Sequence, residues 1–119
     1  MKFNEINSVK DLRKYCKVSK TSLTLTPQTP IKYHGVNVLI QVIYSYSTPI
    51  GYIISNNIGR IENNTPYETN ILYVLNRDTF FSNTTSRYLF TLRKICDCMV
   101  RKDTLRIILS DLGFKTGKL

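Results

Sequence analysis

The clearest pattern along the chain is the alternation of apolar and polar residues over Val36–Tyr46. Even-numbered positions carry valine, isoleucine or tyrosine, and most odd-numbered positions are polar. A period of two with one mixed face predicts a strand that rests on the core with one face and is partly covered on the other. Three further β-favouring runs predict strands at Thr21–Thr26, Ile50–Ser55 and Asn70–Asn76.

Prolines and glycines mark the boundaries of these strands. Pro27 and Pro30 are expected to end the first strand in a turn, and the dipeptide His34-Gly35 indicates another turn. Pro49 lacks the N–H group that a central ladder requires, so it marks an edge, a bulge or a turn.

Helical periodicity is found at both ends of the chain. Ser8 can cap a first helix that extends to Lys17. Its apolar face is formed by Val9, Leu12 and Cys16, and its exterior is basic.

The segment Phe81–Arg101 predicts a second helix. Ser or Thr residues commonly cap helices, and the candidates for this N-cap are Thr84, Thr85 and Ser86. The expected apolar stripe consists of Leu89, Leu92, Cys96 and Met99.

Asp103 is expected to cap a third helix, which ends at Gly113 with Phe114 in the position of a Schellman contact. Together the elements predict one α+β domain over residues 1–119. An antiparallel sheet of about four strands is expected to carry the N-terminal helix and the two C-terminal helices on one face.

Charge adds a feature that the periodicity does not show. The net charge is +9, with six basic and two acidic residues in 1–20, two of each in 21–76, and nine basic and four acidic residues in 77–119. Basic ends around a neutral middle attract nucleic acid, an anionic membrane or an acidic protein surface.

Several classes of function are disfavoured. Three cysteines without an apolar N-terminal segment indicate a reducing compartment, and no apolar run approaches the roughly 18 residues that span a bilayer. On a helix, Cys96 and Cys98 point about 200° apart and cannot share a zinc ion. His34 is the only histidine, and there is no glycine-rich phosphate loop. We therefore expect no enzyme, no metal, no cofactor and no membrane partner.

Within the second helix, the cations Arg87, Lys94 and Arg101 are seven residues apart and would stack nearly in line. Thr84, Thr85 and Ser86 would add hydroxyls at a helix N-terminus suited to an anion; the alternative is plain N-capping with Arg87 in solvent. These six residues are the candidate nucleic-acid or anion site.

A second candidate is a set of strand aromatics that could stack on bases. It consists of Tyr44, Tyr46 and Tyr52, of which Tyr46 is included in the candidate site. The alternative is that their rings pack in the core.

Two segments, Ser45-Tyr46-Ser47-Thr48-Pro49-Ile50 and Phe81-Ser82-Asn83-Thr84-Thr85-Ser86-Arg87, resemble the motifs of a widespread family of small phage and prophage proteins. Tyr88 stands where that family usually has histidine. The resemblance implies a viral origin and a helix packed across a small sheet, and it implies no activity. Within it, the motif hydroxyls could instead form a structural network of Ser45, Thr48, Thr84, Thr85 and Ser86.

The sequence thus favours a non-enzymatic phage protein in its host's cytoplasm that binds nucleic acid, with Arg87, Lys94 and Arg101 on phosphates. One alternative is an anti-CRISPR-like inhibitor that blocks an acidic or nucleic-acid-binding surface of a host defence protein by protein–protein contact. Another is a virion structural or cargo component. The sequence leaves the oligomeric state open.

Overall fold

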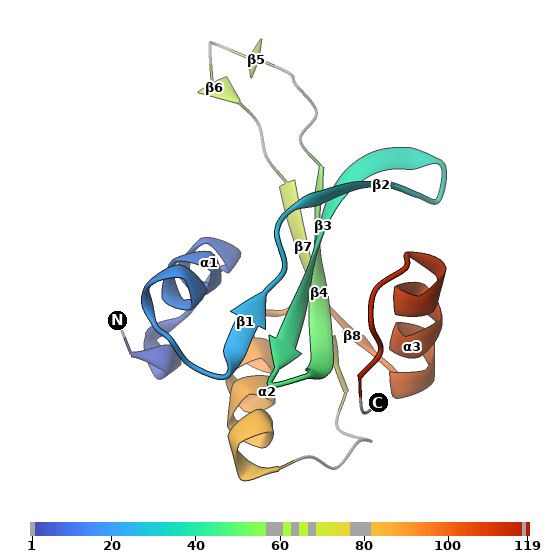
Figure 1. Ribbon diagram of the computed structural model, residues 1–119. Coiled ribbons are helices and arrows are strands. Elements are labelled where there is room, and N and C mark those ends of the chain that lie inside the picture. The colour runs from blue at the N-terminus through green and yellow to red at the C-terminus, as the bar shows by residue number, and fades with distance from the viewer. Residues whose placement is uncertain (1, 57–60, 63–64, 67–68, 77–81, 118) are drawn as a thin grey trace.

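The fold is centred on two long strands, β3 (Val36–Ser45) and β4 (Thr48–Asn56), which pair antiparallel across a short turn (Figure 1). The computed structural model describes residues 2–56, 61–62, 65–66, 69–76, 82–117 and 119. The pairing shifts register between Ile43 and Tyr44, opposite Pro49. Pro49 therefore lies beside a β-bulge at the start of its strand, where its missing N–H breaks no central ladder.

The remaining strands extend this pair into a six-stranded sheet with the order β1-β3-β4-β7-β8, in which β2 also pairs with β3. The added strands are β1 (Leu23–Leu25), β2 (Thr29–Tyr33), β7 (Thr69–Leu75) and β8 (Cys98–Val100). Two short strands, β5 (Ile61–Glu62) and β6 (Thr65–Pro66), form a separate ribbon. The prediction of about four antiparallel strands is wrong, because β2 and β8 add two and β8 runs parallel to β7.

The α+β class, with an N-terminal helix and two C-terminal helices, is confirmed. These helices are α1 (Val9–Val18), α2 (Asn83–Ile95) and α3 (Lys102–Asp111), and a 3-10 turn, η1 (Phe3–Glu5), precedes them. Ser8 caps α1 by accepting from the Asp11 N–H. The Schellman motif after α3 is also present, because the Phe114 N–H donates to the Leu109 carbonyl.

Helices cover both faces of the sheet, so the expectation that all three pack on one face is wrong. Ser45 faces α2, where its hydroxyl meets that of Thr85. The preceding residue, Tyr44, points to the opposite face and donates to the Lys115 carbonyl, in the segment that follows α3 (Figure 1). The seven residues Pro49–Ser55 of β4 are all buried. A strand that is apolar on both faces requires this double cover.

The second predicted helix is shorter than expected. It ends at Ile95, and the chain turns into β8 instead of continuing to Arg101. Asp97 fixes this change, because its N–H donates to the Leu72 carbonyl and its carboxylate accepts from the Leu72 N–H at 2.8 Å. Arg101 is consequently the residue before α3, and Cys96 and Cys98 do not share a helix. Phe81, in the predicted helix segment, lies outside the described residues.

Candidate nucleic-acid interface

The two sequence motifs meet where α2 begins. Ser45 Oγ and Thr85 Oγ1 are 2.7 Å apart, and both residues are buried. Ser82 is the N-cap of α2: its hydroxyl accepts from the Thr85 N–H and donates to Thr85 Oγ1. The expected capping by Thr84, Thr85 or Ser86 is therefore wrong. The structural network is confirmed for Ser45 and Thr85, so Thr85 is not available to a ligand.

The buried stripe of α2 determines which residues face outward. Its members are Thr85, Tyr88, Leu89 and Leu92. The Tyr88 hydroxyl lies 2.8 Å from Ser22 Oγ, and the Phe3 ring packs edge-on against the Tyr88 ring with centroids 5.0 Å apart. Phe3 also contacts the Tyr15 ring of α1 at 5.4 Å, so it joins the two helices on this side of the sheet.

Opposite this stripe, α2 presents an aromatic ring between two cations. Asn83, Arg87, Phe90 and Lys94 are spaced by four, three and four residues, which places them on one helical face. Phe90 is 57% exposed. The Lys94 ammonium lies 4.3 Å from the centroid of the Phe90 ring, a cation–π contact. This exposed phenyl ring, with a cation on each side of it along the helix, is available to a partner.

Two hollows flank Phe90. One is an open groove of about 700 Å³ lined by Phe3, Asn4, Asn83, Ser86, Arg87, Phe90 and Thr91. The other, about 250 Å³, is lined by Phe90, Arg93, Lys94 and Met99, and Met99 is 58% exposed. We call all the described residues that line one hollow or the other the α2 surface. None of these residues is acidic.

Arg93 holds the α2 surface in place. Its Nε donates to the Leu75 carbonyl at 2.8 Å, and a terminal nitrogen donates to the Asn76 carbonyl. These bonds fasten the second half of α2 to the end of β7. Arg93 is therefore an anchoring residue, in contrast to the exposed cations Arg87 and Lys94.

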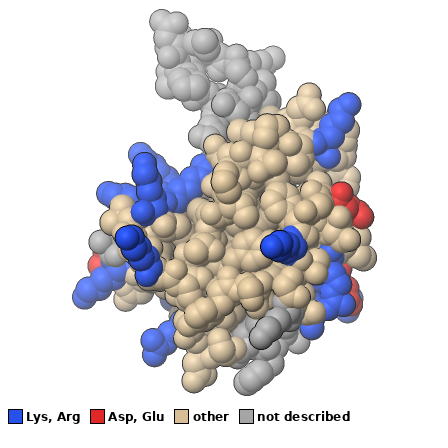
Figure 2. Space-filling view, viewed as in Figure 1, with Lys and Arg blue, Asp and Glu red and all other residues tan. Residues whose placement is uncertain are grey.

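The outer side of α1 adds more positive charge, as its sequence predicts. Lys10, Lys14 and Lys17 are exposed, and lysine and arginine side chains gather over α1 in Figure 2. Phe3 contacts Tyr15 of α1 and Tyr88 of α2, so this basic helix is a neighbour of α2 on the same side of the sheet.

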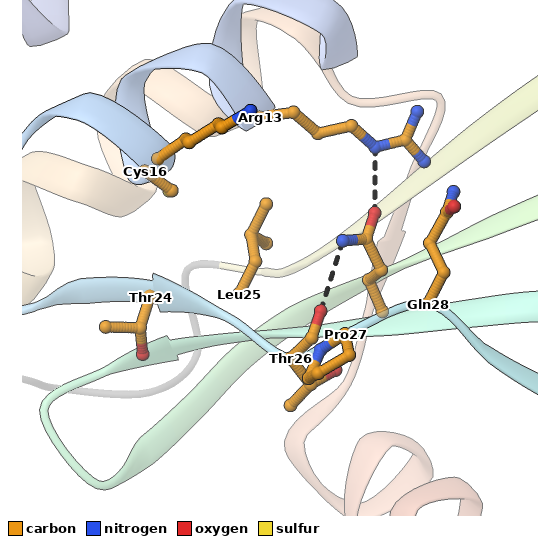
Figure 3. Close-up of a pocket in the computed structure, with 9 residues that line it drawn as sticks. Arg13, Cys16, Thr24, Leu25, Thr26, Pro27 and Gln28 are labelled. Carbon is orange, nitrogen blue, oxygen red and sulfur yellow. Dashed lines mark hydrogen bonds between the residues drawn. The ribbon is translucent and has the colours of Figure 1, made fainter.

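Arg13, in contrast, reaches inward from α1 to the sheet. Its guanidinium donates to Gln41 and Ser55 at 2.8 Å and to Asn70 at 3.1 Å. The Gln41 amide in turn donates to the Thr26 carbonyl, and the dashed lines in Figure 3 mark this chain of hydrogen bonds from Arg13 to Thr26. A groove of about 620 Å³ adjoins this cluster. The bonds tie α1 across three strands, so Arg13 orients the basic helix.

The structure separates the predicted site residues. Thr84, Ser86, Arg87 and Lys94 are exposed on α2, whereas Thr85 is buried and Arg101 lies beyond β8. The predicted line of Arg87, Lys94 and Arg101 is wrong because α2 ends at Ile95.

The strand aromatics also separate. Tyr52 is buried, with its ring stacked on Tyr73 at 4.5 Å, and Tyr44 is half-buried. Tyr46, at the β3–β4 turn, is 66% exposed. Because helices cover both sheet faces, bases cannot stack on the sheet at Tyr52. Phe90 is not among the candidate site residues predicted from the sequence. Its spacing, three residues after Arg87 and four before Lys94, predicts that it shares a helical face with these two cations.

No protein-family model, curated protein or solved structure matches the chain. Among the described residues, no group of three His, Cys, Asp or Glu side chains is arranged to hold a metal ion. The described helices are also too short or too polar to cross a membrane.

Proposed function

We propose that the protein is a small non-enzymatic module that binds nucleic acid through the α2 surface, with further contacts from the basic side of the neighbouring helix α1. The observation that carries this proposal is the exposed Phe90 ring between Arg87 and Lys94. Nucleic-acid sites commonly combine cations for the phosphates with aromatic rings for the bases.

The charge distribution supports an extended polyanion as partner. Arg87 offers a planar fork that matches phosphate oxygens, whereas lysine acts as a compact positive charge. The exposed lysines of α1 belong to the helix that Phe3 joins to α2, and they add positive charge on the same side of the sheet. Each phosphate that such a surface neutralises releases counterions, and this release favours binding at low salt.

The resemblance of the two motifs to small phage proteins places this module, in our proposal, in the cytoplasm of a phage-infected host. The hydrogen bond between Ser45 and Thr85 gives the motifs a structural role, so in this proposal the exposed outer face of α2 contacts the partner.

A second candidate is contact with an acidic surface of a host defence protein. It is favoured by Met99 and Phe90, which are both more than half exposed beside Lys94. Aromatic residues and methionine are enriched where proteins meet.

The test compares two double variants of equal charge. Arg87→Ala/Lys94→Ala removes the two cations of the α2 surface, and Lys32→Ala/Lys115→Ala removes two exposed cations elsewhere. At low salt, fluorescence anisotropy should show much weaker binding of a labelled oligonucleotide only for the first variant. Equal binding by both variants, or no binding by the unchanged protein, would contradict the proposal. Capture of a host protein that survives nuclease treatment of the lysate would favour the second candidate.

A further inference from the structure

We propose that the α2 surface takes an unpaired base on Phe90, so that its ligand is a single strand rather than a duplex. This inference rests on the proposed function and specifies the class of nucleic acid. In a duplex, bases are stacked on one another and only their edges and the phosphates reach the surface. A single strand can instead place a base face on an aromatic ring.

The Phe90 ring is accessible to a base. More than half of its surface is exposed, and its cation–π partner is the flexible Lys94 side chain. A cation–π contact at an exposed site is weak. The ammonium can therefore move from the ring to a neighbouring phosphate when a base arrives, and the positive charge stays at the site.

The groove beside Phe90 has the composition that a nucleotide requires. Its volume of about 700 Å³ falls within the usual range of small-molecule sites. Phe3 and Phe90 supply apolar surface, while the side-chain amides of Asn4 and Asn83 supply donors and acceptors for a base edge. Arg87, in the same groove, supplies the fork for a phosphate. One groove therefore offers a contact for each part of a nucleotide: the face of the base, the edge of the base and the phosphate.

The groove is also held in shape. The Phe3 ring contacts Tyr15 and Tyr88, and α2 is fixed to the sheet by the hydroxyl pair of Thr85 and by Arg93. A surface that is already ordered loses little conformational freedom on binding. The described residues that line the groove include no carboxylate that would repel a backbone phosphate.

Because the chain contains no tryptophan, Phe90→Trp creates a single indole reporter at the site. We expect quenching of its fluorescence by unstructured single strands, tested as oligo(dT) and oligo(U), and none by a duplex of equal length. In anisotropy titrations, single strands should bind at least about tenfold more tightly than the duplex. Phe90→Ala should remove most of that difference, because stacking on an aromatic ring contributes on this scale.

Two control variants distinguish stacking from general changes. Phe90→Leu keeps an apolar side chain without a ring and should behave like Phe90→Ala. Among the described residues, Tyr46 is the other strongly exposed tyrosine or phenylalanine. Tyr46→Asn removes its ring, keeps a residue that tolerates the φ of 56° at that turn, and should retain the preference.

Two results would overturn the inference while the proposed function stands. One is duplex binding as tight as single-strand binding, with both weakened by Arg87→Ala/Lys94→Ala. The other is full single-strand affinity in Phe90→Ala with unquenched indole fluorescence in Phe90→Trp. If neither form of nucleic acid binds, both proposals fall. Different affinities for oligo(dT) and oligo(U) would point to a further contact with the 2′-hydroxyl or the thymine methyl group and would leave the role of Phe90 unchanged.

Discussion

The hydroxyl pair that joins the two sequence motifs can be tested by a double-mutant cycle. Thr85→Val keeps the shape of the side chain and leaves Ser45 Oγ, in a residue only 1% exposed, without its 2.7 Å partner. A buried hydroxyl without a partner costs about 1–3 kcal/mol. We expect this loss in the free energy of unfolding.

The second single change should cost less. In Ser45→Ala, Thr85 Oγ1 still accepts from the Ser82 hydroxyl at 3.2 Å, so no buried oxygen is stranded. The loss is then the net value of one hydrogen bond, about 0.5–1.5 kcal/mol. The double variant contains neither hydroxyl and should lose less than the two single changes added together, with a coupling energy of about 1 kcal/mol.

The assay is urea denaturation followed by far-UV circular dichroism, with thermal melts as a second measure, in which about 1 kcal/mol shifts Tm by roughly 4 °C. Losses that add to within about 0.5 kcal/mol would refute a direct bond between Ser45 and Thr85. None of the three variants should change oligonucleotide affinity at temperatures where all are folded, because Thr85 is buried. A selective loss of binding would show that the motif contacts the ligand.

Three further predictions concern other parts of the fold. Gly117→Ala should lower the free energy of unfolding by about 1–3 kcal/mol, because φ is +57° and the added Cβ would lie 2.0 Å from a backbone oxygen of the β3–β4 turn. Gly35→Ala, also at positive φ but with no atom within 4 Å, should cost less in the same urea assay. Arg13→Lys should destabilise by about 1–3 kcal/mol, because lysine cannot reproduce a fork that bonds three strands, and a cost near zero would contradict that role. Burial raises the pKa of the Cys16 thiol to about 11, so at pH 8 Cys16 should be alkylated more slowly than the exposed Cys98. Peptide mass spectrometry would show this order, and it should disappear in urea; equal rates in the folded protein would contradict the burial of Cys16.

The long periodic elements were predictable because their patterns repeat. The alternation in β3 and the cap and apolar face of α1 each extend over about ten residues, and both elements lie where the sequence places them. The three-residue strand β8 gave no such signal. Its Met99 matches the helical spacing that continues from Leu92, and no glycine or proline marks the end of α2. The helix ends there because the following residues pair with β7, through the two hydrogen bonds between Asp97 and Leu72 and the parallel pairing of β8.

The candidate site was predicted only in part for the same reason, because contacts between distant segments leave no local sequence pattern. Arg87 and Lys94 were predictable from spacing within one helix, whereas Arg101 was assigned to that helix only because β8 was missed. Strand β2 was also missed, because Pro30 indicates a turn in the sequence. In the structure β2 pairs with β3 along one edge, and an edge strand tolerates proline. The groove beside Phe90 also needs Phe3, which is more than 80 residues away in the sequence. Contacts of that kind follow from tertiary packing and cannot be read from local pattern.

The most direct test of the central claim is the salt dependence of single-strand binding. Log affinity should fall linearly with log salt concentration for the unchanged protein. In Arg87→Ala/Lys94→Ala the slope should become shallower by about 1.4, since each phosphate contact with a single strand contributes about 0.7. Lys32→Ala/Lys115→Ala should keep the original slope. Equal slopes in the two double variants would show that the α2 surface does not hold the nucleic acid.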